Sequence, residues 1–92
     1  MRIAGYIKHP NYKITIFHMN NRYSLKFENG QYEQTYKLRE SDLFNNVEQV
    51  KAIVDEDFLN AVQAQFKSQN ISFQAAHERL LNIEEDEFDE II

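Results

Sequence analysis

The 92-residue chain has no cysteine and no tryptophan, and it contains one proline and two glycines. Without cysteine the protein can form no disulfide and no cysteine-based zinc site, and it has no thiol chemistry. Gly5 and Gly30 are too few for a glycine-rich phosphate loop, and the sequence has no nucleophile elbow. No apolar run approaches the roughly 18 residues that a membrane-spanning helix requires. The sequence therefore argues against several classes of enzyme and against a membrane protein.

Residues that bind metals or transfer protons are scattered along the chain. The three histidines, His9, His18 and His77, show no metal-ligand spacing. Paired carboxylates occur at Asp55 to Asp57 and near the C-terminal end, where helix capping and solvation account for them. We therefore expect a protein that is not an enzyme, with no catalytic residues, no metal site, no cofactor and no small-molecule substrate.

Length and composition indicate one folded domain. A chain of this length buries enough surface for one core, and 42% hydrophobic and 13% aromatic residues are typical of a globular protein. No apolar segment of the kind found in secretion signals follows Met1. Together with the lack of cysteine, this favours the cytoplasm as the location.

The net charge of -5 is distributed unevenly along the chain. Residues 1–40 carry seven basic and three acidic side chains, which gives +4, and residues 41–83 carry -3. Residues 84–92 contain six acidic side chains and no basic one. We expect residues 1–83 to form a single domain and residues 84–92 to be a flexible acidic tail, because repulsion between its carboxylates opposes packing.

The strongest local signal is a hairpin over residues 23–38, where two alternating runs flank Asn29-Gly30. A two-residue type I′ turn at Asn29-Gly30 needs positive φ at both positions and would fix the register of the two strands. This register also places two basic residues opposite each other, which is unfavourable. The predicted opposite pairs are Phe27 with Tyr32, Leu25 with Gln34, Tyr23 with Tyr36, Lys26 with Glu33, and Arg22 with Lys37.

Alternation of apolar and polar residues predicts a four-stranded antiparallel meander with strands at about 2–9, 12–19, 22–29 and 31–39. Asn20-Asn21 suits a tight turn, because asparagine tolerates left-handed backbone. Gly5 marks a bulge or a close approach of backbone, and His18 is expected at the edge of the apolar face. The turns place on this inner face the opposite pairs Ile7 with Ile14, Ile16 with Leu25, and Ile14 with Phe27.

After Glu40 the apolar spacing changes from two residues to about 3.6, which predicts two or three helices on the inner face and an α+β fold. The expected helices cover residues 46–54, 56–69 and 73–83. Asn45 or Asn46 caps the first helix, Asp55 the second and Ser72 the third. The apolar stripes are Leu43, Val47, Val50 and Val54, then Phe58, Leu59, Val62 and Phe66, then Phe73, Ala76, Leu80 and Ile83.

The outer face of the predicted sheet is basic and carries aromatic rings. All seven basic residues of the first forty point outward in this register, whereas Ile3 points inward. Arg2, Arg22 and Lys37 form one row across the sheet, an alignment that an anion bound over them would explain. An ordinary solvated face is the simpler alternative. The candidate residues for an anion or nucleic-acid face are Arg2, Tyr6, Phe17, Arg22, Lys26, Lys37 and Arg39.

Several partners are compatible with these surfaces. Nucleic acid suits basic groups interleaved with rings, because phosphates supply affinity and bases stack on the rings. An acidic peptide would suit the same face. Apolar groups on that face also support the hypothesis of a homodimer through Tyr6, Phe17 and Met19.

The acidic tail has three alternative interpretations. It could be a solvated segment, it could fold back onto the basic face, or another protein's groove could capture it through Phe88, Ile91 and Ile92. We expect a small binding or adaptor protein that uses its outer sheet face, with single-stranded nucleic-acid binding there or recruitment through the tail as alternatives.

Parts of the sequence resemble known families. The runs AGYIKHP, KITIF, NNRY, YEQTYK and VDEDF, over residues 4–58, resemble a family of short, uncharacterised bacterial proteins, and this implies no particular activity. Four antiparallel strands followed by a helix are similar to the repeat of the PUR family, which implies single-stranded nucleic-acid binding on the sheet and pairing into dimers. The C-terminal end resembles the partner-recruiting tails of bacterial single-stranded-DNA-binding proteins, although Ile91-Ile92 stands where those tails end in Pro-Phe.

Overall fold

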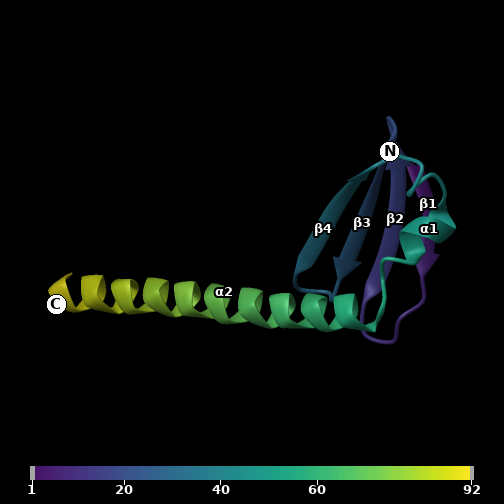
Figure 1. The fold of residues 1–92 in the computed structure, drawn as a ribbon. Coiled ribbons are helices and arrows are strands. Elements are labelled where there is room, and N and C mark those ends of the chain that lie inside the picture. Colours follow the sequence, from purple (N-terminus) through teal and green to yellow (C-terminus); the bar gives the residue numbers. More distant parts are fainter. Residues whose placement is uncertain (1, 92) are drawn as a thin grey trace.

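The computed structural model describes the backbone of residues 2–91 and the side-chain surroundings of residues 2–82. Four strands form one antiparallel sheet in sequence order, and two helices follow (Figure 1). This confirms an α+β fold with a four-stranded meander followed by helices. The strands are β1 (Arg2–Ile7), β2 (Lys13–Met19), β3 (Arg22–Glu28) and β4 (Glu33–Arg39), and the helices are α1 (Val47–Lys51) and α2 (Glu56–Ile91).

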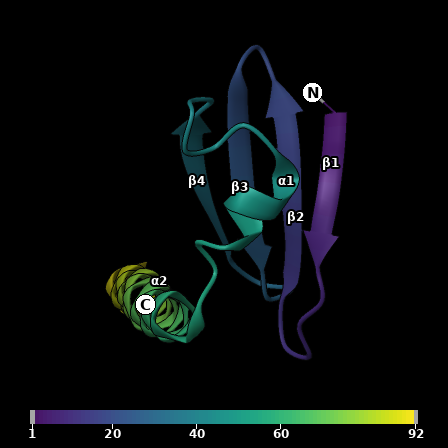
Figure 2. The same ribbon diagram turned by 45° about the vertical axis from the view of Figure 1, so that its right-hand side comes forward.

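The core lies between the inner face of the sheet and the two helices, which cover the same face (Figure 2). Phe27 is fully buried at its centre and meets Phe58 of α2 edge-on, with ring centroids 5.6 Å apart. Burial of such side chains is the main favourable term for a domain of this size. The buried apolar side chains are Ile14, Ile16, Tyr23, Leu25, Phe27, Val50, Val62 and Phe66.

The predicted register is confirmed between β2 and β3 and, in β1, from Gly5 to Ile7. Ile7 lies opposite Ile14, and Ile16 lies opposite Leu25. Asn20 and Asn21 form the turn between β2 and β3 with φ of 52° and 60°, the left-handed backbone that asparagine tolerates better than other side chains. The positive-φ pair that was expected at Asn29-Gly30 therefore occurs one hairpin earlier.

The register of the β3–β4 hairpin differs from the prediction by two residues. Phe27 lies opposite Gln34, and the two central turn residues are Gly30 and Gln31. Gly30 has a φ of 95°, whereas the Asn29 side chain accepts hydrogen bonds from the backbone N–H groups of Gln31 and Tyr32, at 3.0 and 2.8 Å. An asparagine that bonds the backbone beyond it favours this shifted turn. The observed opposite pairs include Leu25 with Tyr36, Tyr23 with Leu38, Lys26 with Thr35, and Arg22 with Arg39.

A shift of two residues keeps every side chain on its predicted face, because side chains alternate with a period of two. The hairpin therefore buries the side of β3 that was expected. Lys26 also remains close enough to Glu33 for an ion pair of 3.6 Å, although the two residues are diagonal instead of directly opposite.

A bulge at Ala4 corrects the prediction for the start of the chain. Ile3 lies opposite Phe17 and Gly5 lies opposite Ile16, so β1 has one extra residue between them. Because of the extra residue, the side chains before it lie on the opposite faces from those predicted. Ile3 therefore points outward, and Arg2 lies in the inner-face row of His18. At Gly5 a Cβ atom would lie 3.1 Å from a Val47 methyl group, which explains why glycine suits this close approach of α1.

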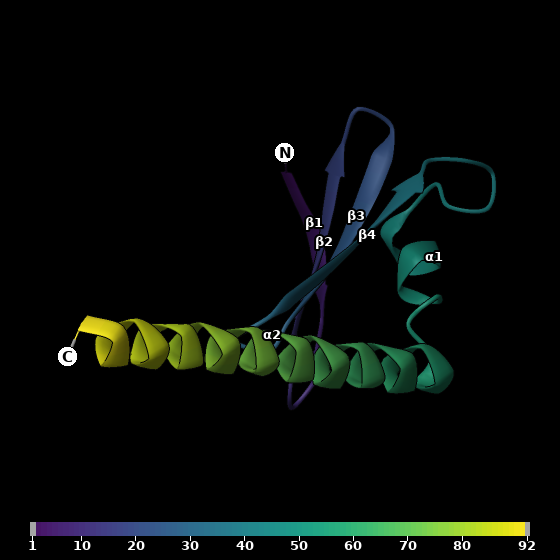
Figure 3. The ribbon, with the colours of Figure 1, turned by 90° about the vertical axis from the view of Figure 1, so that its left-hand side faces the viewer.

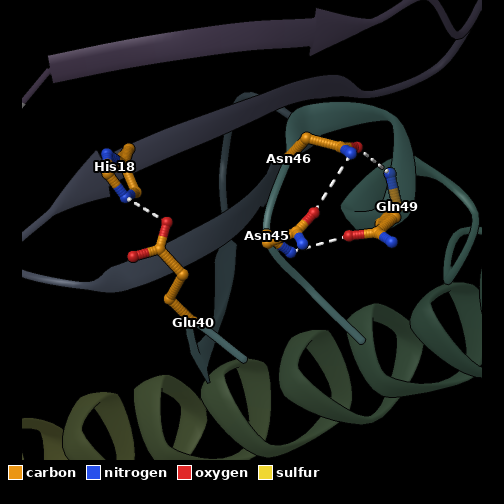
Figure 4. A network of polar contacts seen from close by, with 5 residues as sticks. All are labelled: His18, Glu40, Asn45, Asn46 and Gln49. Atoms are coloured by element: carbon orange, nitrogen blue, oxygen red, sulfur yellow. Dashed lines mark hydrogen bonds and ion pairs between the residues drawn. The ribbon is translucent and has the colours of Figure 1, made fainter. Parts of the chain in front are cut away.

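Helix α1 is shorter than predicted and is fixed by a reciprocal cap. The Asn46 side chain accepts a hydrogen bond from the Gln49 N–H at 2.9 Å, and the Gln49 side chain accepts one from the Asn45 N–H at 2.7 Å (Figure 4). Leu43 precedes the helix and is 68% exposed, so its predicted place in the apolar stripe is wrong. Asp55 caps α2 as predicted, accepting a hydrogen bond from the Phe58 N–H at 2.8 Å.

The two predicted helices at 56–69 and 73–83 are one continuous helix. Asn70 and Ser72 both lie within it, and the Asn70 side chain accepts a hydrogen bond from the Tyr32 hydroxyl at 3.0 Å. No glycine or proline interrupts this segment, so nothing opposes the continued helix strongly. The C-terminal half of α2 consequently leaves the sheet at the β4 edge instead of packing on it (Figures 1 and 3).

The backbone of α2 continues to Ile91, into the segment predicted to be a flexible tail. The side chains of the candidate tail residues Phe88 and Ile91, and the whole of Ile92, lie outside the described part of the protein. The three interpretations of the tail therefore stay predictions.

Thr15 provides a test of the sheet's packing. It is 2% exposed on the outer side of β2, and its hydroxyl finds no hydrogen-bond partner among the described residues. We expect Thr15→Val to raise the free energy of unfolding by about 1 kcal/mol, because it removes a buried unpaired hydroxyl at nearly constant shape. Urea denaturation measures the change, and Thr35→Val, in the same row but exposed, is the control. A loss of stability in Thr15→Val would contradict the described environment.

Candidate functional site

The outer face, the sheet face opposite the helices, is organised in cross-strand rows about 7 Å apart, since every second residue of a strand shares a face. The observed register fixes the members of each row. From the end of the sheet nearest the β2–β3 turn, the rows are Met19, Arg22 and Arg39; Ile3, Phe17, Ser24 and Lys37; Tyr6, Thr15, Lys26 and Thr35; and Lys13, Glu28 and Glu33.

Three exposed cations gather at one end of this face, and we call Arg22, Lys37 and Arg39 the basic corner. Arg22 lies directly opposite Arg39, and Lys37 is two residues from Arg39 on the same strand and the same face. None of the ion pairs found among the described residues involves any of the three. Opposed like charges destabilise a strand pair, so this corner costs stability that no ion pair among the described residues offsets.

A small hollow of about 110 Å³ adjoins the basic corner. It is lined by Phe17, Met19, Arg22, Ser24 and Lys37. The sequence prediction brought Phe17, Arg22 and Lys37 to one surface, and the structure places all three around this hollow. Its volume is well below the roughly 300 Å³ at which small-molecule pockets begin. The hollow therefore suits a single small group, such as a phosphate or the edge of a ring, more than a whole metabolite.

The remaining predicted residues have different surroundings. Tyr6 lies on the outer face and is 54% exposed, so its ring is accessible. Lys26 is on the outer face too, but its ammonium group lies 3.8 Å from Glu28 and 3.6 Å from Glu33, so it already has carboxylate partners. Arg2 is outside the site, because the bulge turns it to the inner-face row. Of the seven basic residues, the face holds Lys13, Arg22, Lys26, Lys37 and Arg39.

Ile3 is the outer-face residue that the sequence prediction missed. It is 50% exposed and lies beside Phe17, where it extends the apolar part of the face toward the β1 edge. The sequence signal for this position is Gly5, since a bulge next to it places Ile3 on the outer face. Ser24, which lines the hollow, carries no signal of its own.

A second polar cluster joins the rim of the sheet to the segment before α1. His18 Nε2 lies 3.2 Å from Glu40 Oε1 (Figure 4). The centroid of the His18 ring lies 4.5 Å from that of the Tyr23 ring. His18 is thus at the edge of the inner face, as predicted. In the part of the chain with described side chains, no three His, Cys, Asp or Glu residues gather as metal ligands would.

Neither the family models nor the curated proteins nor the solved structures that were compared with the chain give a match. The resemblances noted from the sequence accordingly stay predictions. None of the described helices has both the length and the apolar character that crossing a membrane requires. The outer face itself therefore provides the evidence about function.

Proposed function

We propose that this protein is a small, non-enzymatic binding protein whose outer face holds single-stranded nucleic acid. The observation that carries the proposal is the basic corner, where Arg22 opposes Arg39 beside Lys37 without a carboxylate partner among the described residues. A bound phosphate group between these side chains would turn an unfavourable arrangement into a favourable one.

The neighbouring rows supply the second component of such a site. Phe17 and Met19 line the hollow next to the cations, and Tyr6 exposes its ring one row further from the corner. Bases stack on exposed aromatic rings with about 1–3 kcal/mol each and little sequence preference. Phosphates at the corner and bases over the rings would give binding that depends on charge and stacking more than on sequence.

An acidic peptide is the alternative ligand for the same face. It would share the dependence on the basic corner but would gain little from an exposed ring, because stacking requires the flat face of a base. Tyr6→Leu separates the two ligands, since it keeps an apolar side chain and removes the ring. For nucleic acid we expect this variant to lose the contribution of one stacked base, and for poly-glutamate we expect no change.

Fluorescence anisotropy with a labelled oligothymidine tests the proposal directly. Three neutralised phosphates predict a slope of about -2 for the logarithm of the association constant against the logarithm of salt concentration. Binding should be clear at low salt and weak at physiological salt. No binding at about 50 mM salt, or a slope near zero, would overturn the proposal.

A further inference from the structure

Positive charge is concentrated at one end of the outer face instead of being spread along it. None of the ion pairs found among the described residues involves the three cations of the basic corner. Lys26, nearer the middle of the face, has two carboxylate partners. The row at the far end contains one basic and two acidic residues. A polyanion along the whole face would meet repulsion there, so the face suits one concentrated group of negative charge.

The hollow of about 110 Å³ beside the basic corner brings two of the three cations to one point. Arg22 and Lys37 line it together with Ser24, and Phe17 and Met19 supply its apolar lining. Guanidinium, ammonium and hydroxyl groups all donate hydrogen bonds, and a phosphate oxygen accepts from each of them. Because both helices lie on the other face of the sheet, neither of them covers the hollow (Figure 2).

A phosphate at the end of a strand fits this hollow better than a phosphate within a strand. A terminal phosphate monoester carries a charge of about -1.5 to -2 at pH 7 and has three acceptor oxygens. A diester phosphate carries a single negative charge, and the strand continues on both sides of it. A hollow with room for one small group therefore admits a terminal phosphate, from which the strand leaves in one direction only.

We propose that the hollow binds the terminal phosphate monoester of a single-stranded nucleic acid, held by Arg22, Lys37 and the Ser24 hydroxyl. This inference rests on the proposed function and makes it more specific. It turns a general affinity for single strands into a preference for strands with a phosphorylated end.

The rest of the strand would extend from the corner across the aromatic part of the face. Arg39 lies opposite Arg22 and outside the lining of the hollow, so it remains available for the adjoining diester phosphate. Tyr6 is 54% exposed and lies in the row after that of Phe17, so the two rings offer successive stacking surfaces. A strand held in this way has a fixed polarity, with its phosphorylated end at the β2–β3 end of the sheet.

Anisotropy titrations with one internally labelled oligothymidine test the inference. The oligothymidine is prepared with a 5′-phosphate, with a 3′-phosphate, or with hydroxyl groups at both ends. We expect at least one phosphorylated form to bind about tenfold more tightly than the unphosphorylated form at low salt, because the added charge lies close to two unpaired cations. The form that gains affinity identifies the end that occupies the hollow.

Ser24→Leu fills the hollow and leaves every charge in place. Ser24 is partly buried on the outer face, so the variant should keep the circular dichroism spectrum of the sheet. It should bind phosphorylated and unphosphorylated forms with equal affinity. Thr35→Leu is the matched control, because Thr35 lies on the same face but outside the lining, and it should keep the tenfold preference. If Ser24→Leu does not fold, Lys37→Gln is the second variant, and it should reduce the preference to about threefold or less.

The outcomes separate this inference from the proposed function. Equal affinities of all forms for the unaltered protein would overturn the inference and leave the proposed function standing, whereas no binding of any form would overturn both. A preference that persists in a folded Ser24→Leu variant would place the terminal phosphate elsewhere and overturn its assignment to the hollow. Inorganic phosphate is the competitor, and displacement at concentrations equal to those of the phosphorylated strand would make free phosphate the ligand and overturn the assignment to nucleic acid.

Discussion

Replacing Leu25 with alanine is expected to lower the free energy of unfolding by about 2–5 kcal/mol, because the substitution leaves a cavity in a closely packed core. Leu25 is 1% exposed and lies between Ile16 and Tyr36 on the inner face. A loss of this size is a large part of the stability of a domain of this length. Urea denaturation followed by circular dichroism measures it.

Leu43→Ala is the matched control for this prediction. Leu43 is 68% exposed and precedes α1, so the same chemical change should alter the free energy of unfolding by no more than about 0.5 kcal/mol. Similar losses in the two variants would show that Leu43 belongs to the core, as the sequence pattern suggested. That result would contradict the observed end of the apolar cluster.

Arg22→Glu is expected to make the protein more stable and at the same time a weaker binder of oligothymidine. A carboxylate opposite Arg39 replaces a like-charge pair by an opposite-charge pair, which should raise the free energy of unfolding by about 0.2–1 kcal/mol. The same change should lower the affinity at low salt about tenfold or more, which corresponds to at least about 1.4 kcal/mol. Thermal unfolding and anisotropy measure the two effects.

A gain in stability together with a loss of affinity in Arg22→Glu distinguishes a binding site from an ordinary solvated face. Lys67→Glu controls for net charge, since Lys67 is exposed on α2, away from the outer face, and the change in charge is identical. It should leave affinity nearly unchanged. If Lys67→Glu weakens binding as much as Arg22→Glu does, binding depends on total charge, and the basic corner has no special role.

Most of the sheet could be predicted because the error in the β3–β4 turn left every side chain on its predicted face. The β3–β4 turn is shifted from Asn29-Gly30 to Gly30-Gln31, but a shift of two residues leaves Leu25 and Phe27 on the inner face. The turn chemistry was ambiguous, since asparagine can adopt left-handed backbone or bond the backbone beyond it, and the structure uses Asn20-Asn21 for the first and Asn29 for the second.

An error of one residue has a larger effect than an error of two. The bulge at Ala4 exchanges the faces of Arg2 and Ile3, which removes Arg2 from the candidate site and adds Ile3. Alternation alone cannot reveal a bulge, because it assumes an uninterrupted pleat. The close contact between Gly5 and Val47 that accompanies the bulge joins residues far apart in the sequence, so no local pattern contains it.

The helical region shows what local sequence signals could not predict. Asn70 is typical of a helix end and Ser72 of an N-cap, yet neither residue prevents a helix. Whether the helix continues or breaks there depends on whether the apolar stripe that follows can reach the sheet. In the structure the stripe at Phe73 and Leu80 does not reach it and is exposed instead. The sequence indicated an apolar stripe there correctly, but it could not tell which surface the stripe contacts.

The composition of the candidate site was predicted in part, and its cross-strand pairing was not. Phe17 and Lys37 gather beside Arg22 as expected, while the residue opposite Arg22 is Arg39 instead of Lys37. The consequence for function is small, because the opposed pair remains basic in either register. Ion pairing of Lys26 depends on side-chain conformation, which strand alternation does not specify.

The most direct test of the proposed function is a nuclear magnetic resonance titration of the isotope-labelled protein with oligothymidine at low salt. The account predicts that the backbone amide signals of Phe17, Arg22, Ser24 and Lys37 shift together, while those around Val50 and Val62, on the opposite side of the sheet, stay in place. Shifts confined to α1 and α2, or no shifts at ligand concentrations that saturate binding, would contradict it.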